Sequence, residues 1–93
     1  MPLKSPELRR TWLFGPGAHP PTHAAMALSG ADGLILDLED FTPPELRPQA
    51  RQNLSQVVHM WKDSGALVCI RINQLETDGP LDLEAAMRAA YVE

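Results

Sequence analysis

The chain has 93 residues, of which 44% are hydrophobic and 22% are charged, a composition that is typical of a globular protein and excludes a disordered one. A formal net charge of −4 argues against a nucleic-acid partner and against polybasic attachment to a membrane. The single cysteine, Cys69, excludes an intrachain disulfide framework, and there is neither a signal-peptide pattern nor an apolar run of membrane-spanning length. We therefore expect one small cytoplasmic domain, preceded by a flexible tail over residues 1–9.

The first predicted unit is a short strand followed by a helix. Residues 11–14 have the β-branched and aromatic side chains that favour a strand, and Gly15-Pro16-Gly17 ends it. Pro20 and Pro21 suit the first turn of a helix, because the N–H groups of that turn make no hydrogen bond within the helix. The alanine-rich segment after them predicts a helix that ends at Ser29-Gly30.

The next segment, residues 33–39, is an apolar run typical of a strand buried on both faces of a parallel sheet. Three carboxylates lie at its end: Asp37, Glu39 and Asp40. Because an unpaired buried carboxylate is costly, these groups must meet solvent, a cation, basic side chains or helix N-termini. Alternation along a strand predicts that Asp37 and Glu39 share one face and that Asp40 points to the other. The alternative is a strand that ends in a solvated acidic turn.

A turn and a long helix follow. Thr42-Pro-Pro-Glu45 has the spacing of a capping box with proline at the first helical position. Pro48 would then lie inside the helix without an N–H to donate, so we expect a turn over 42–47 and a helix from about Pro48 to Gly65. Its apolar positions repeat with the helical period and predict a buried face made of Ala50, Leu54, Val57, Val58 and Trp61.

Residues 66–70 predict a third buried strand, which ends in Arg71-Ile72-Asn73. After a polar loop, Asp82 is expected to cap a last helix, whose apolar positions are Leu83, Ala86, Met87 and Ala90. Repeated βα units with short connections imply parallel strands and right-handed crossovers. The predicted fold class is therefore α/β, with a parallel βαβαβα order.

The carboxyl ends of parallel strands lie at one edge of a sheet, so three segments should meet there: Gly15–Gly17, Asp37–Asp40 and Arg71–Asn73. The glycine segment would let an anion approach backbone N–H groups at a helix N-terminus. The carboxylates could hold a hydrated divalent cation, and the planar fork of Arg71 could bind a carboxylate. Arg71 and Asn73, two apart on a strand, should face the same side. The alternatives are that the glycine segment is only a turn and that Arg71 pairs with a neighbouring carboxylate in a structural network.

Other potentially reactive side chains show no pattern of their own. His19, His23 and His59 have no shared spacing with carboxylates or cysteines, and we interpret them as surface or helix-end residues. Cys69, in the middle of a strand, is interpreted as a small buried side chain and not as a nucleophile.

Four segments together resemble, in order and spacing, the opening of the citrate lyase β-subunit-like family, which are CoA-ester lyases grouped with the HpcH/HpaI aldolases. These segments are Arg10–Gly17, Gly30–Asp40, Pro44–Arg51 and Arg71–Asn73. The resemblance covers about residues 9 to 90 and implies the first three units of a TIM-type (β/α)8 barrel. Because such a barrel has ~250 residues or more, residues 1–93 would be a single partial domain, about the first third of a family member.

The resemblance also implies an activity. It is that of a Mg²⁺-dependent carbon–carbon lyase, acting on a 3-hydroxyacyl-CoA such as citryl-CoA or malyl-CoA and on a keto acid. The metal would act as a Lewis acid that polarises a keto-acid carbonyl and stabilises enolate charge. The full-length form is expected to be a homo-oligomer, and residues 1–93 to be inactive alone.

The resemblance assigns roles to residues by position. Arg71 would be the catalytic residue that binds the substrate carboxylate, and Glu39 and Asp40 would hold waters of the Mg²⁺ ion, whose direct ligands are expected outside this chain. The substrate and CoA side would be bordered by the remaining candidates, which are Arg10, Gly15, Pro16, Gly17 and Asn73. Ala18 and His19 stand where the family often has basic residues.

Two alternatives from the residues themselves stay open. One is a non-catalytic remnant that binds a partner or an anionic ligand, and the other is a barrel aldolase that acts on free keto acids.

A three-stranded parallel sheet by itself has two open edges and an uncovered face. We therefore expect residues 1–93 alone to be poorly stable, to self-associate, or to fold only with further strands.

Overall fold

The structure, a computed structural model, describes residues 5–8 and 10–90. Strands and helices alternate as predicted: β1 (Trp12–Pro16), α1 (Pro20–Ala27), β2 (Gly33–Asp37), α2 (Arg47–Asp63), β3 (Leu67–Arg71) and α3 (Gly79–Ala90). Two short 3-10 helices, η1 (Pro6–Leu8) and η2 (Pro44–Leu46), complete the elements. Of the tail predicted over residues 1–9, residues 1–4 and 9 lie outside the described residues. None of the described helices combines the length and the hydropathy needed to cross a membrane.

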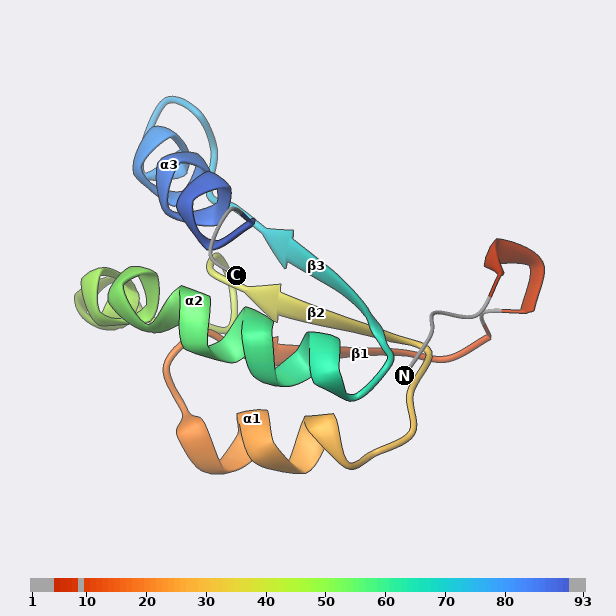
Figure 1. Cartoon of the computed structure of the whole chain (residues 1–93). Coiled ribbons are helices and arrows are strands. Elements are labelled where there is room, and N and C mark those ends of the chain that lie inside the picture. Colours follow the sequence, from red (N-terminus) through yellow and green to blue (C-terminus); the bar gives the residue numbers. More distant parts are fainter. Residues whose placement is uncertain (1–4, 9, 91–93) are drawn as a thin grey trace.

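The three strands form one parallel sheet in the order β1-β2-β3 (Figure 1). β1 reaches Pro16, two residues further than predicted, whereas β2 already ends at Asp37. The reason for the early end is local, because Asp37 Oδ1 accepts the Glu39 N–H at 2.9 Å and the Thr42 hydroxyl donates to the Asp37 carbonyl at 2.7 Å. These bonds turn the chain away from the sheet, so strand alternation does not apply to the carboxylates that follow.

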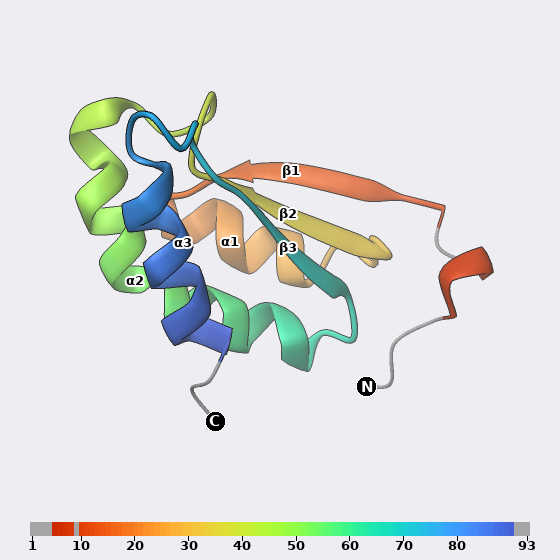
Figure 2. The ribbon, with the colours of Figure 1, turned by 90° about the horizontal axis from the view of Figure 1, so that it is seen from above.

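The helices lie on one side of the sheet (Figures 1 and 2). Leu34 and Leu36 of β2, and Leu38 directly after it, point into the core between sheet and helices, where all three are at most 1% exposed. All five residues predicted for the buried face of α2 are buried as well. Burying a large aliphatic side chain stabilises a fold by roughly 1.5–3 kcal/mol. Packing against α2 therefore supplies much of the stability of this sheet.

The other face of the sheet is covered by no helix of the described residues. Trp12 and Phe14 point to that face and are 43% and 48% exposed. Trp12 packs on Gly33, where an added Cβ would lie 2.2 Å from a carbon of the indole ring. β3 was expected to be buried, but all five of its residues are only half-buried. It is an edge strand with a neighbour on one side only, which explains the difference.

The start of α2 at Arg47 confirms the helix predicted from about Pro48, whereas the predicted start of the last helix after Asp82 is wrong. Thr42 is not a capping residue, since η2 begins after Pro43 without a side-chain cap and the Thr42 hydroxyl binds elsewhere. α3 begins at Gly79, so Asp82 lies in its first turn and not before it. The buried side of α3 is formed by Asp82, Ala85 and Ala89. By contrast, two of the predicted apolar positions, Leu83 and Met87, are 46% and 52% exposed.

Candidate active site

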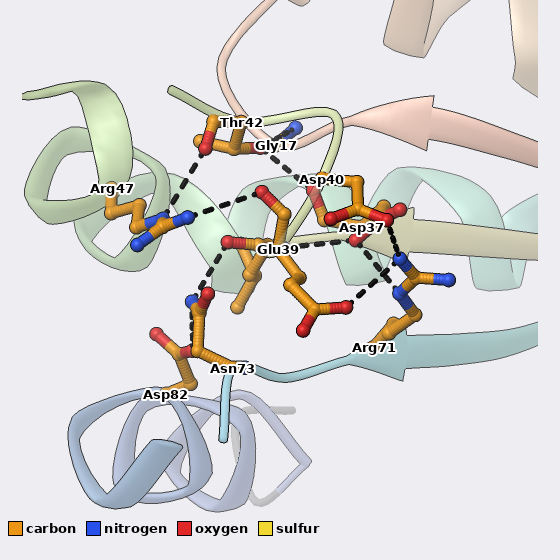
Figure 3. Close-up of polar contacts among 10 residues, drawn as sticks. Gly17, Asp37, Glu39, Asp40, Thr42, Arg47, Arg71, Asn73 and Asp82 are labelled. Carbon is orange, nitrogen blue, oxygen red and sulfur yellow. Dashed lines mark hydrogen bonds and ion pairs between the residues drawn. The ribbon is translucent and has the colours of Figure 1, made fainter. Parts of the chain in front are cut away.

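The three predicted segments meet at the carboxyl edge of the sheet. Pro16 of β1 pairs with Asp37 of β2, and Asp37 pairs with Arg71 of β3, so the last residues of the strands stand side by side. This result confirms the expectation that parallel strands bring the acidic segment and Arg71 to one edge. Figure 3 shows how the side chains gather there.

Arg71 contacts all three carboxylates. Its Nε lies 3.3 Å from Asp37 Oδ1, and its Nη2 lies 2.9 Å from Glu39 Oε1 and 2.5 Å from Asp40 Oδ2 (Figure 3). The predicted separation of Asp40 from the other two is therefore wrong, because the chain turns after Asp37 and carries Asp40 back to Arg71. The network of Arg71 with its neighbours, one of the alternatives derived from the sequence, is present.

Burial differs strongly within this cluster. The side chain of Asp37 is 1% exposed, that of Arg71 38% and that of Asp40 72%. Burial alone would lower the pKa of Arg71, but the charges of Asp37, Asp40 and Glu39 outweigh it and raise that pKa above its ordinary value. Arg71 is thus a permanent cation that pairs with Asp37 at its buried side. At its exposed side, solvent or a ligand can replace Asp40.

Sequence reasoning missed a pair of aromatic rings at this site, of which Phe14 contacts Arg71 and Phe41 contacts Phe14. The Arg71 guanidinium carbon lies 5.8 Å from the centroid of the Phe14 ring, within the range of a cation–π contact. Phe14 in turn meets Phe41 edge to face, with 6.4 Å between centroids. The sequence did contain a signal for Phe14. Phe14 and Pro16 are two apart on β1 and so share a face, and Pro16 pairs in register with Asp37 of the acidic strand. The rings limit the directions in which the guanidinium can turn.

The glycine segment is a packing feature. The Gly17 N–H donates to the Thr42 hydroxyl at 2.7 Å, and a Cβ at Gly17 would lie 2.7 Å from that oxygen and 2.8 Å from Leu38. At the start of α1, Pro20 and Pro21 have no N–H, and the Thr22 N–H donates to the His19 ring at 3.3 Å. The N–H groups of Gly17 and Thr22 are therefore occupied within the chain, and the binding of substrate or CoA by Gly15, Pro16 and Gly17 stays a prediction. The structure agrees with the simpler alternative, a turn.

Arg10 does not lie with the other candidates. Its N–H donates to Asp32 at 2.7 Å, and Asp32 directly precedes β2. Arg10 therefore belongs to the amino edge of the sheet, at the opposite end from Arg71. The expectation that Arg10 borders the same side as Gly15–Gly17 is corrected by the length of β1, which separates them.

Asn73 is turned into the protein. It is 5% exposed, and its Nδ2 donates to the Leu38 carbonyl at 2.8 Å and to Asp82 Oδ2 at 2.7 Å. β3 ends at Arg71, so the strand alternation that would place Asn73 beside Arg71 does not extend to it. Its amide joins the residue after β2 to α3, and its contact with substrate stays a prediction.

The described residues contain no group of three or more His, Cys, Asp or Glu side chains that could hold a metal ion directly. Glu39 and Asp40 each place one carboxylate oxygen on Arg71, and each has a second oxygen able to accept from water. These side chains are 32% and 72% exposed. They fit the binding of metal-bound waters and do not by themselves make a ligand set.

His23 is the residue that sequence reasoning placed wrongly, since it is 3% exposed and not at the surface. Its Nε2 lies 2.6 Å from the Pro16 carbonyl, to which it donates, and its ring meets Trp61 edge to face. Burial is the main reason that the pKa of His23 lies below 6.5, with a smaller lowering from His19, although the bond to Pro16 acts in the other direction. His19 and His59 are exposed, as expected.

Comparison with known proteins places these features in a family. The model of the family described as HpcH/HpaI aldolase/citrate lyase matches residues 10–90. The chain belongs to this family. The resemblance carried by the four segments is thereby confirmed.

Several named proteins are similar in sequence to this chain. The L-malyl-CoA/beta-methylmalyl-CoA lyase of Rhodobacter capsulatus is 43% identical over 70 residues, which are 75% of this chain and 22% of that protein. The enzyme of the same name from a Cereibacter sphaeroides strain is 40% identical over 68 residues, or 73% and 21% of the two chains. Citrate lyase subunit beta of Leuconostoc mesenteroides subsp. cremoris is 29% identical over 75 residues, or 81% and 25%. The chain thus matches about a fifth to a quarter of the length of these relatives, less than the expected third.

Proposed function

We propose that the protein is a Mg²⁺-dependent carbon–carbon lyase that cleaves or forms a 3-hydroxyacyl-CoA, and that residues 10–90 are three βα units of a TIM-type barrel. Family membership and the similarity to proteins named as malyl-CoA lyases support the reaction class. The parallel order of β1, β2 and β3, with helices on one side, supports the barrel.

The observation that carries the proposal is the state of Arg71 at the carboxyl edge of the sheet. Asp37 holds its Nε from the buried side, and Nη1 has no ion-pair or hydrogen-bond partner among the described residues. A guanidinium held in this way offers two nitrogens to an incoming carboxylate once the exposed Asp40 gives way. We assign to Arg71 the binding of the carboxylate that a 3-hydroxyacyl substrate such as malyl-CoA carries.

In the cleavage direction, the bond between the hydroxyl-bearing carbon and the carbon next to the thioester carbonyl breaks. The hydroxyl group loses its proton and becomes the carbonyl of a keto acid, and the bonding pair passes to the thioester enolate, which then takes up a proton. Bound Mg²⁺ would supply Lewis-acid stabilisation of negative charge on oxygen. Within this chain, Arg71 orients the carboxylate and Glu39 and Asp40 accept from metal-bound water.

The proposal is tested with the complete protein, malyl-CoA and Mg²⁺, by following the release of the keto acid. Arg71→Lys keeps the charge but loses the planar fork, so we expect kcat/KM to fall about 100-fold or more. The matched control is Arg88→Lys, because Arg88 has only a pair with Glu84 at 3.9 Å and is 71% exposed. Unchanged turnover in Arg71→Lys would contradict the role of Arg71.

A second candidate, an aldolase acting on free keto acids, is favoured by one observation. The Gly17 N–H and the first turn of α1 offer no free donor to a CoA phosphate among the groups described above. Assaying the complete protein with a free hydroxy acid in place of its CoA ester separates the two: turnover only without CoA selects the aldolase. Absence of turnover with either substrate would support the non-catalytic alternative.

A further inference from the structure

The segment Pro44–Arg51 carries part of the family resemblance, yet the proposed function gives its two arginines no role. Arg47 and Arg51 are one helical turn apart at the start of α2 and point to the same side. We propose that Arg47 is a positioning residue that holds the loop of Glu39 and Asp40 against Arg71, braced by Arg51 and Asp78. The inference rests on the proposed function, which it extends to residues that contact neither substrate nor metal.

The contacts of Arg47 are with the acidic loop itself. Its Nη2 donates to the Glu39 carbonyl at 3.3 Å and its Nε donates to the Thr42 carbonyl at 3.2 Å (Figure 3). The two carbonyls flank the residues that turn the chain back toward Arg71. One planar side chain thus spans the loop from Glu39 to Thr42, as a guanidinium can and a single amine cannot.

The far side of Arg47 is fixed to the segment before α3. Its Nη1 lies 3.5 Å from Asp78 Oδ2, and Arg51 Nη2 lies 3.1 Å from the same oxygen. Arg51 Nε donates to Asp82 Oδ1 at 2.7 Å. The side chains of Arg47 and Arg51 are 18% and 14% exposed, so solvent screens these pairs less than surface ones.

Asp82 completes the connection to β3. Its carboxylate is fully buried and accepts from the N–H of Asn73 at 2.9 Å as well as from its side chain. Asn73 follows the strand that carries Arg71 by two residues. The chain of contacts therefore fixes the loop after β2 relative to the segment after β3, which means that it fixes Glu39 and Asp40 relative to Arg71.

The ends of this loop are also held by contacts other than those of Arg47, among them the Thr42 N–H, which donates to the Glu39 carbonyl at 3.3 Å. Thr42 is already held by Gly17 and by the Asp37 carbonyl, and Glu39 has its N–H on Asp37. Between them lie Asp40 and Phe41, which are 72% exposed at the side chain and 53% exposed respectively. Arg47 is the side chain that ties the carbonyls at both ends of this exposed pair to one point.

The test is a double-mutant cycle in the complete protein with malyl-CoA and Mg²⁺. Arg47→Met keeps the aliphatic stem and removes the donors, and we expect kcat/KM to fall about 10-fold to 100-fold through misplacement of the loop. Arg88→Met, the same exchange at an exposed position of α3, is the control and should leave kcat/KM within about 2-fold. Combined with Glu39→Gln, Arg47→Met should add little to the loss from Glu39→Gln alone, because both act through the same loop.

A purely structural role would give a different result. In that case Arg47→Met lowers the melting temperature but leaves kcat/KM per folded molecule unchanged, both alone and combined with Glu39→Gln, and this result overturns the inference. If the protein without substitutions shows no turnover, the proposed function fails. The positioning of the loop by Arg47 is then tested by amide hydrogen exchange. Exchange at residues 39–42 should then be faster in Arg47→Met and unchanged in Arg88→Met, and equal exchange in both would overturn the inference separately.

Discussion

At the scale of single residues, the least expected finding is a histidine in the core. His23 is buried, with its ring against the Pro16 carbonyl and in edge-to-face contact with Trp61, and its carbonyl accepts the Trp61 indole N–H at 3.0 Å. Its neutral form is therefore built into the fold. Protonation of His23 in mild acid would therefore disturb the connection between β1 and α1. This connection contacts the loop after β2 through the bond between Gly17 and Thr42.

The pKa of His23 is lowered in the folded state, so the unfolded chain binds a proton first as the pH falls below 6.5. We expect the full stability of this site above pH 6.5 and its progressive loss as the pH falls from there toward the lower pKa of the folded state. One proton limits the slope to about 1.4 kcal/mol per pH unit. His23→Gln, which retains a donor for Pro16, should flatten the difference between unfolding free energies measured at about pH 5 and about pH 7.5. An equally steep dependence in the variant would show that other groups cause it.

At the scale of elements, one buried carboxylate sets the rotation of α3. Asp82 binds Arg51 and Asn73, and residues three and seven further along, Ala85 and Ala89, consequently face α2. Side-chain hydrophobicity alone would turn Leu83 and Met87 inward. The polar contacts prevail because leaving the Asp82 carboxylate buried without partners would cost more than exposing part of two apolar side chains.

Asp82→Asn should therefore destabilise the protein by about 2–4 kcal/mol, because it removes the charge that Arg51 meets and places an amide donor against two others. Glu84→Gln on the exposed side of the same helix is the matched control. Its carboxylate is 65% exposed and lies 3.9 Å from Arg88, so the expected change is within about 0.5 kcal/mol. Urea unfolding of the complete protein measures both, and similar losses for the two variants would refute the role given to Asp82.

At the scale of the whole molecule, the described residues form half of a layered structure. One face of the sheet is packed against helices, and the other is covered by no element of the described residues (Figure 2). Trp12 and Phe14 are exposed on that face, and Ile35, which pairs in register with Phe14, is half-buried there. β1 and β3 are both edge strands, each with a row of backbone groups open to pairing. Further strands of a barrel would cover the face and pair both edges.

We accordingly expect a polypeptide of residues 1–93 alone to self-associate or to lack a cooperative melting transition. Trp12→Gln on the uncovered face should reduce self-association, whereas Leu28→Gln, at an 88% exposed position next to α1, should not. Sedimentation velocity and thermal melting decide the matter. A monomer with a sharp transition would show that the sheet is stable without further strands.

Much of this arrangement follows from local pattern. The buried face of α2 follows from the helical period, and the end of that helix shortly before Gly65 follows from a glycine with a left-handed φ of +88°. The meeting of Asp37 and Arg71 at one edge follows from the parallel order of βα units. Such features depend on neighbours in sequence or on the handedness of the crossover, and both can be read along the chain.

By itself the sequence thus determined the order of elements, the parallel sheet, the family and the edge at which acidic and basic groups meet. The tertiary structure decided which groups contact one another: three carboxylates and Arg71, the Gly17 N–H and Thr42, Asn73 and the Leu38 carbonyl, and buried His23 and Trp61. Asn73 and Leu38 are 35 residues apart, and His23 and Trp61 are 38 apart. No local sequence pattern predicts such a pair. The two groups become partners only because packing removes both from water, and each then needs the other to complete its hydrogen bonds.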